Sequence, residues 1–265
     1  MRFVRIFLLF FQHVTNFRSR NFVWFLIALL NPLFVLIFWI AVIRDNTNIL
    51  GGWNLSSIST YYFLLIIATS LILSHIEEDV AIRDIREGQL VTYLTKPFSY
   101  FQLKFISEIG WRIMQGFFGV MIFSIFYLFF QRFIVLPNSF LEILFSALII
   151  LLAILISFTF KMIVGITAFW FIDFWGLQQI IEVIIVILAG FIMPIELFPD
   201  WLENISKMTP FPYMIYYPIV SLQSKLISPE LVNVIFVQIV WLVILGVTYR
   251  WLWAKGIKRF TGVGQ

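Results

Sequence analysis

The chain has 265 residues, of which 62% are apolar and only 12% are charged. Soluble domains contain about 45–50% apolar residues, so this composition excludes an ordinary soluble protein and indicates a chain that crosses a membrane several times. The chain has no cysteine, which excludes disulfides and thiolate metal sites, and its long apolar runs exclude the alternating strands of a β-barrel.

Residues 1–21 predict an amphipathic helix that lies in the membrane interface. On a helical wheel, polar side chains such as Arg5 and His13 fall on one side, and Phe7 and Phe11 fall on the other. The alternative is a polar lead-in to the first transmembrane span. On neither interpretation do these residues form a substrate site.

Residues 22–265 predict an all-α membrane domain with six transmembrane helices. In chain order the predicted spans are Phe22–Ile43, Ile58–Leu73, Ile113–Phe130, Phe140–Phe171, Ile180–Met193 and Leu231–Trp251. The fourth is 32 residues long, so it either tilts or extends into the headgroups near Lys161.

A densely charged segment, residues 75–104, joins the second and third spans. We predict two short helices in it, Val80–Arg86 and Glu87–Leu94, with a bend at Gly88 and an end before Pro97. The second helix could enter a groove on a partner protein. The alternative is a solvated loop that joins two helices.

Charge is concentrated at the start of this segment, where seven of the eleven residues from Glu77 to Glu87 are charged. Leu90, Tyr93 and Leu94 follow and could fill the partner's groove. The adjacent acids Glu77 to Asp79 point in different directions on a helix, which favours a solvated face over a cation site.

Residues 194–229, the proline-aromatic segment, interleave six prolines with Trp and Tyr side chains. Proline breaks helices, and Trp and Tyr favour the membrane interface. We therefore expect short, broken or re-entrant helices before the last span.

The distribution of Lys and Arg predicts the orientation. With both termini inside, 14 of the 18 basic residues lie in cytoplasmic segments, and the outer segments hold only Arg44, Arg132, Lys207 and Lys225. By the positive-inside rule the charged segment is cytoplasmic and the proline-aromatic segment is outside. The net charge of +4 then reflects attraction to anionic lipids and gives no indication of nucleic-acid binding.

No motif for catalysis or nucleotide binding occurs in the sequence, so we expect no enzyme activity and no cofactor in this chain. Two charged residues fall within apolar stretches, Lys161 and Glu182. Charges in spans usually face a protein interior or a pathway, so both are candidates for a polar pathway or a subunit contact.

Two motifs resemble the permease subunits of bacterial ABC-2 type exporters. The first is Arg83-Asp-Ile-Arg-Glu-Gly-x-Leu-x-x-x-Leu-x-Lys-Pro97, after the second span, and the second is Gly190-Phe-x-x-Pro-x-x-x-Phe-Pro-x-Trp201. Phe169-Trp170 and Trp175-Gly176 resemble the family more weakly. The resemblance covers nearly the whole chain.

The resemblance implies the ABC-2 (type V exporter-like) fold and a permease without its own ATPase. Two permeases, identical or related, would form the translocation pathway as a dimer above two separate cytoplasmic ATPase subunits, which bind ATP and Mg. By similarity, the coupling helix lies around Glu87–Leu94, and the coupling residues are Arg83, Asp84, Arg86, Glu87, Gly88, Leu90, Leu94 and Pro97. The outer gate would comprise Gly190, Pro194, Phe198, Pro199 and Trp201.

We therefore expect a multi-pass exporter subunit of the bacterial inner membrane, with both termini cytoplasmic. An ion-gradient-driven secondary transporter is the alternative, and it predicts internal repeats and several polar groups at the midplane. A membrane-embedded enzyme acting on lipids is a third reading, which the lack of clustered His, Asp or Ser in the spans disfavours. The sequence identifies neither the transported substrate nor whether the second permease is identical.

Overall fold

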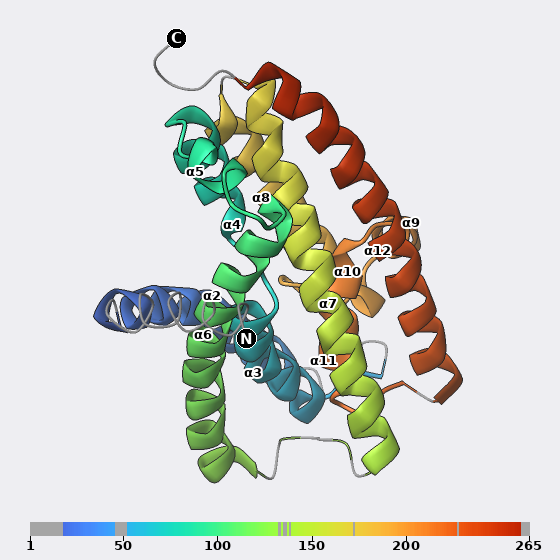
Figure 1. Ribbon diagram of the computed structural model, residues 1–265. Coiled ribbons are helices and arrows are strands. Elements are labelled where there is room, and N and C mark those ends of the chain that lie inside the picture. Colours follow the sequence, from blue (N-terminus) through green and yellow to red (C-terminus); the bar gives the residue numbers. More distant parts are fainter. Residues whose placement is uncertain are drawn as a thin grey trace.

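The computed structural model describes residues 18–45, 52–131, 134, 137, 139–171, 173–226 and 228–260. Within these ranges the chain is helical and forms no β-strand, as the sequence predicts. The six long helices (Figure 1) are α2 Arg18–Asp45, α3 Leu55–Leu71, α6 Tyr100–Phe130, α7 Phe140–Ile166, α8 Phe174–Leu188 and α12 Ser228–Gly256.

The short helices lie in the two segments for which the sequence predicts breaks. The charged segment contains α4 Ile76–Glu78, the π-helix η1 Asp79–Arg86 and α5 Leu90–Leu94. The proline-aromatic segment contains η4 Ile195–Leu197, α9 Asp200–Lys207, α10 Phe211–Met214 and α11 Tyr216–Ser221. Two 3-10 turns, η3 Thr167–Phe169 and η5 Ile257–Arg259, follow α7 and α12.

Side-chain caps determine where several long helices begin. Asn54 accepts a hydrogen bond from the Ser57 amide at 2.8 Å, and Ser99 accepts one from the Gln102 amide at 3.2 Å. Both are capping boxes, which satisfy amides that a helix start leaves without partners. Asp173 caps α8 by accepting from the Gly176 amide at 3.1 Å.

α7 packs against several of the other described elements, and it runs alongside α12 (Figure 1). It also contacts α4, η1, α10 and α11, whereas α3 packs against α2 and α6. Where α7 meets α12, Ile149 of α7 is fully buried. Gln238 of α12 donates to the carbonyl oxygens of Ile149 and Tyr213, both at 3.0 Å, so a polar side chain in the core ties three elements together.

Each predicted span falls on one of the six long helices, but several boundaries differ: α7 ends at Ile166 rather than Phe171, α12 continues to Gly256 rather than Trp251, and α6 and α8 differ most. α6 begins at Tyr100 rather than Ile113, because the Ser99 capping box starts it within the charged segment. α8 covers Phe174–Leu188 rather than Ile180–Met193, because Asp173 starts it early and the chain turns at Gly190, where φ is +91°.

Three helical stretches of the described residues are long and apolar enough to cross a membrane, namely Leu55–Arg86, Phe140–Phe169 and Pro229–Arg259. The apolar stretches Leu33–Val42 and Phe174–Leu188 are shorter. These helices support a multi-pass membrane protein, while the number of six crossings stays a prediction. Of the predicted N-terminal amphipathic helix, residues 1–17 lie outside the described residues, and α2 begins at Arg18.

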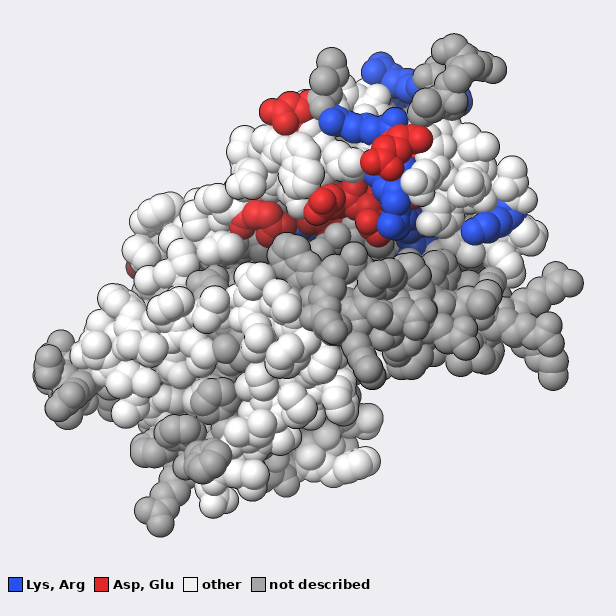
Figure 2. All heavy atoms as spheres, turned by 90° about the vertical axis from the view of Figure 1, so that its left-hand side faces the viewer, with Lys and Arg blue, Asp and Glu red and all other residues white. Residues whose placement is uncertain are grey.

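Charged side chains gather toward one end of the molecule. Figure 2 shows Lys, Arg, Asp and Glu concentrated in the upper half of the visible face, while the described surface below them is almost entirely uncharged. Figure 1 places α5 and the end of α12 at this same upper end. This separation of charge is the arrangement expected of a chain whose lower part lies in lipid.

Candidate functional site

The charged segment begins with a continuous helical stretch, α4 and η1, which a turn joins to the short helix α5. At Gly88 the backbone adopts a φ of +77°, the left-handed region that costs glycine little and other residues more. The bend therefore lies where the sequence predicts it. The second helix is shorter than predicted, since α5 begins at Leu90 instead of Glu87 and ends at Leu94, before Pro97.

A buried ion pair holds η1 against the first turns of α6. Asp84 has no exposed surface and lies 2.5 Å from the Nζ of Lys104, which is also buried. The Tyr100 hydroxyl donates to the same carboxylate oxygen at 2.5 Å. Burial, together with the charge of Asp84, raises the pKa of Tyr100 above its ordinary value, so its hydroxyl stays protonated and remains a donor.

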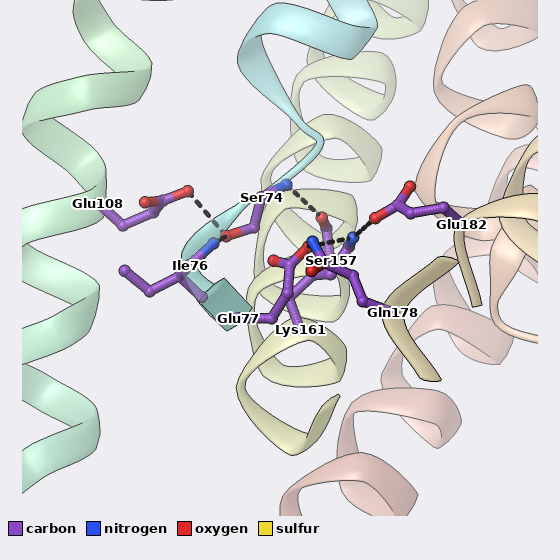
Figure 3. A network of polar contacts seen from close by, with 8 residues as sticks. All are labelled: Ser74, Ile76, Glu77, Glu108, Ser157, Lys161, Gln178 and Glu182. Atoms are coloured by element: carbon purple, nitrogen blue, oxygen red, sulfur yellow. Dashed lines mark hydrogen bonds and ion pairs between the residues drawn. The ribbon is translucent and has the colours of Figure 1, made fainter. Parts of the chain in front are cut away.

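A second buried cluster connects α4, α7 and α8 (Figure 3). The Nζ of Lys161 donates to Oε1 of Glu77 at 2.7 Å and also bonds Glu182. Gln178 of α8 donates to the same oxygen of Glu77 at 3.3 Å. Lys161 and Glu182, predicted separately as polar candidates, are thus partners in one network.

The prediction that Glu77, Glu78 and Asp79 form a solvated face is wrong for Glu77. Its side chain is fully buried against α7, whereas Glu78 is exposed and Asp79 is half exposed. Three adjacent helical residues point in different directions, and one of them had to face the neighbouring helix. The sequence could have suggested this, because Lys161 needs a carboxylate partner if it is buried.

Sequence reasoning missed a third polar cluster, at the end of α3. Arg112 of α6 donates to the carbonyl oxygens of Leu71 and Ile72 at 2.9 and 2.5 Å, which the end of α3 leaves without helical partners. Its Nε lies 3.3 Å from Glu108, and Glu108 accepts from the Ser74 hydroxyl at 2.7 Å (Figure 3). The sequence signal that could have revealed this cluster is the spacing of Glu108 and Arg112, which stand four residues apart in a largely apolar helix.

The exposed face of the charged segment differs from the predicted one. Leu90 is fully buried within the chain itself and cannot enter a partner's groove, which corrects that prediction. Leu94 and Val91 are exposed at 48% and 46%. Tyr93 is partly buried, because its ring packs edge-on against Tyr100.

Of the remaining residues of the first motif, most lie on the outside. Arg83 pairs with Asp79 at 2.8 Å on the surface, and Arg86 donates to the Phe171 carbonyl at 3.0 Å. Glu87 and Pro97 are exposed and Gly88 is half buried. Asp84 alone among the charged motif residues is buried, so its role is to hold the segment in place.

One group of residues offers potential metal-ligand atoms that all lie within 4.8 Å of one another, namely His75, Glu77 and Glu182. Lys161 already donates to both carboxylates of this group. A metal ion here would have to displace the ammonium or share the site with a like charge. The arrangement is therefore an ion-pair network rather than a metal centre.

The turn that begins the second motif is held by three side chains from α2 and α3. Tyr61 donates to the Gly190 carbonyl at 2.7 Å, and Tyr62 donates to the Ile192 carbonyl at 2.6 Å. Trp39 donates to the Ile192 carbonyl as well, at 3.2 Å. Backbone groups that would otherwise lack partners at the end of α8 are thus satisfied by aromatic residues far away in the sequence.

The predicted gate residues divide into a packed and an exposed group. Gly190, Pro194 and Phe198 are buried, whereas Pro199 is exposed and Trp201 is 64% exposed. The structure therefore packs the first three residues inside the chain and leaves the last two on the surface.

A comparison with protein families identifies the chain. The family model of the ABC-2 family transporter protein matches residues 29–264, and the chain therefore belongs to the ABC-2 transporter family. It is a membrane permease of the ABC transporter class, and such permeases normally work with an ATPase partner. No curated protein and no solved structure matches the chain.

Proposed function

We propose that this chain is the permease subunit of an ATP-driven exporter, which forms its pathway as a dimer with an identical or related permease. Two copies of a separate ATPase subunit bind ATP and Mg and dock beneath it. The observation that carries the proposal is the build of the charged segment: α5 presents exposed apolar side chains, while buried ion pairs fix its base.

The ATPase contacts the exposed surface around α5. Val91 and Leu94 provide apolar area, and Glu87 lies beside them at the turn. An exposed helical turn with apolar anchors and a charged edge is the usual form of helix-in-groove recognition. Arg83, Arg86 and Pro97 flank this surface, whereas Leu90 and Asp84 support it from below.

In this proposal, movement of the ATPase is transmitted to the transmembrane helices through the two buried clusters. The Asp84–Lys104 pair transmits displacement of η1 to α6, and the Glu77–Lys161 pair transmits displacement of α4 to α7. Glu182 extends the second route to α8. Because breaking a buried pair costs several kcal/mol, roughly 3–5, these contacts move as rigid units rather than slide.

The turn at Gly190 and the short helices after it form the outer gate of this proposal. α8 leads directly into that turn, and Tyr61 and Tyr62 attach it to α3. A shift of α8 at Glu182, midway along the helix, is thereby carried to the turn at Gly190 and on to Pro194 and Phe198. The charged segment faces the cytoplasm of a bacterial inner membrane, and the proline-aromatic segment faces outward.

The test begins with purification in mild detergent, where an ATPase in equimolar amount should accompany the chain. Leu94→Asp should then weaken ATPase binding roughly thirtyfold, because the loss of an apolar interface anchor costs on the order of 2 kcal/mol. Glu87→Ala and Gly88→Pro should abolish transport and permease-stimulated ATP hydrolysis while the protein stays in the membrane.

A matched control is Met208→Asp, which changes an apolar side chain that is 78% exposed at the end of α9. It should leave ATPase binding as in the unaltered chain. Export that continues without any ATPase and collapses with the proton gradient would contradict the proposal.

A further inference from the structure

A groove lies beside the C-terminal half of α12, apart from the surfaces discussed so far. Its volume is about 410 Å³, within the range of roughly 300–1,000 Å³ typical of small-molecule sites. The first turn of α6 and Thr159 of α7 form its other walls. The residues that define it are Tyr100, Phe101, Gly246, Tyr249, Arg250 and Trp253.

The α12 wall is a single helical face, because Gly246, Tyr249, Arg250 and Trp253 are spaced by three and four residues. Trp253 stacks on Tyr100 with ring centroids 4.9 Å apart, and Tyr249 lies 5.0 Å from Phe101. Rings held in this way form a rigid apolar floor. Trp and Tyr are also the side chains that collect where a membrane meets water.

Gly246 leaves the groove open, although no neighbouring atom is close enough to require a glycine at this position. A Cβ atom at this position would meet no other atom within 4 Å. Glycine inside a helix is less favourable than alanine. The absence of a side chain at this position therefore leaves open a space that no described part of the protein fills.

Arg250 supplies a positive charge at the edge of the groove. It is exposed and forms no ion pair or hydrogen bond with any other described residue. Nearby cations are engaged elsewhere, since Lys104 pairs with Asp84 and Lys255 lies 3.7 Å from the Trp251 ring centroid. The groove thus combines an available guanidinium with an open apolar channel.

We propose that this groove binds one anionic phospholipid, whose phosphate pairs with Arg250 while one of its acyl chains lies over Gly246 against the aromatic floor. Guanidinium groups bind phosphate through paired, charge-assisted hydrogen bonds. The assignment to the cytoplasmic leaflet follows from the orientation proposed above. The binding itself requires neither the ATPase nor the proposed coupling route.

Native mass spectrometry of the full chain in detergent, titrated with phosphatidylglycerol or phosphatidylcholine, tests this site. The unaltered chain should bind one phosphatidylglycerol more tightly than phosphatidylcholine, and glycerol phosphate without acyl chains should not bind. Arg250→Gln should weaken phosphatidylglycerol binding roughly tenfold, or about 1.4 kcal/mol, and abolish the preference, because the charged hydrogen bonds to the phosphate are lost.

Lys258→Gln removes one charge from an exposed position at the same end of α12 and should leave the preference intact. Gly246→Leu should fill the groove and reduce the binding of both lipids, with a melting temperature no lower than that of the unaltered chain as evidence of folding. Equal phosphatidylglycerol binding by Arg250→Gln and the unaltered chain would overturn the proposal. A Gly246→Leu variant that no longer dimerises but still binds lipid would also overturn the proposal. That result would mean that a second copy of the chain, and not a lipid, occupies the groove.

Discussion

Asp79 and Asp84 lie on the same short helix and each pairs with a cation, yet their surroundings differ completely. The Asp79–Arg83 pair is nearly half exposed, at 47% and 46%, while Asp84 and Lys104 are 0% and 2% exposed. Exposed pairs contribute about 0–1 kcal/mol, whereas removal of one partner of a buried pair costs much more. At the scale of single residues, burial decides which charges hold the structure.

Asp84→Asn should therefore destabilise the protein by about 3–5 kcal/mol, because it leaves Lys104 buried without a counter-charge. Asp79→Asn, the same chemical change on the same helix, should cost less than about 1 kcal/mol. The measurement is the free energy of unfolding in mixed micelles titrated with a denaturing detergent. Equal losses for the two variants would show that the Asp84 pair does not anchor η1.

Lys161→Met should have a similarly large cost, since Glu77 would keep a buried charge with no cation. Adding Glu77→Gln should restore at least half of the lost unfolding free energy, because it removes that charge. The Lys207→Met variant, in a surface pair that is 45% and 23% exposed, provides the control. A double variant no more stable than Lys161→Met would contradict this explanation.

At the scale of elements, the contact between η1 and α7 depends on one glycine that the sequence did not single out. A Cβ atom at Gly165 would lie 2.7 Å from Cβ of Val80 and 3.0 Å from the Glu77 carbonyl oxygen. Val80 is fully buried there. The glycine lets the charged segment approach the α7 backbone closely enough for the Glu77–Lys161 pair to form.

Gly165→Ala should thus push η1 away from α7 and lower the free energy of unfolding by about 1–3 kcal/mol. Gly246→Ala is the matched control, since it adds the same methyl group to a helix where nothing lies within 4 Å. That variant should be stabilised by about 0.5–1 kcal/mol. The two melting temperatures, measured side by side, should shift in opposite directions.

At the scale of the whole molecule, charges collect at the end that carries the charged segment, and uncharged surface covers the rest of that face (Figure 2). The aromatic turn at Gly190 lies at the far end of α8 from the Asp173 cap. The proposed orientation puts the charged segment on the cytoplasmic side and directs the proline-aromatic segment toward the outside. The proposed coupling requires this separation.

Cysteine labelling can test that arrangement directly, because the chain contains no cysteine and any introduced thiol is unique. Glu87→Cys should react with a membrane-impermeant maleimide only after the cells are permeabilised. Met208→Cys, at a site that is 78% exposed, should react in intact cells. The opposite pattern would reverse the proposed orientation, and reaction of both in intact cells would refute it.

The sequence alone determined the class of the protein, the approximate positions of the long helices and the bend at Gly88. These follow from local physics: apolar runs of sufficient length, prolines that break helices, and a glycine where the backbone turns to positive φ. The two motifs also indicated the family that the comparison then confirmed. None of these inferences needed contacts between distant residues.

Only the tertiary structure decided which residues of the candidate site face inward. Glu77 and Leu90 looked like surface residues, and Lys161 and Glu182 looked independent, yet all four take part in buried or paired contacts. Those contacts join positions separated by up to 84 residues in the chain. Burial of a side chain depends on the neighbours that folding brings to it, and a local pattern does not contain them.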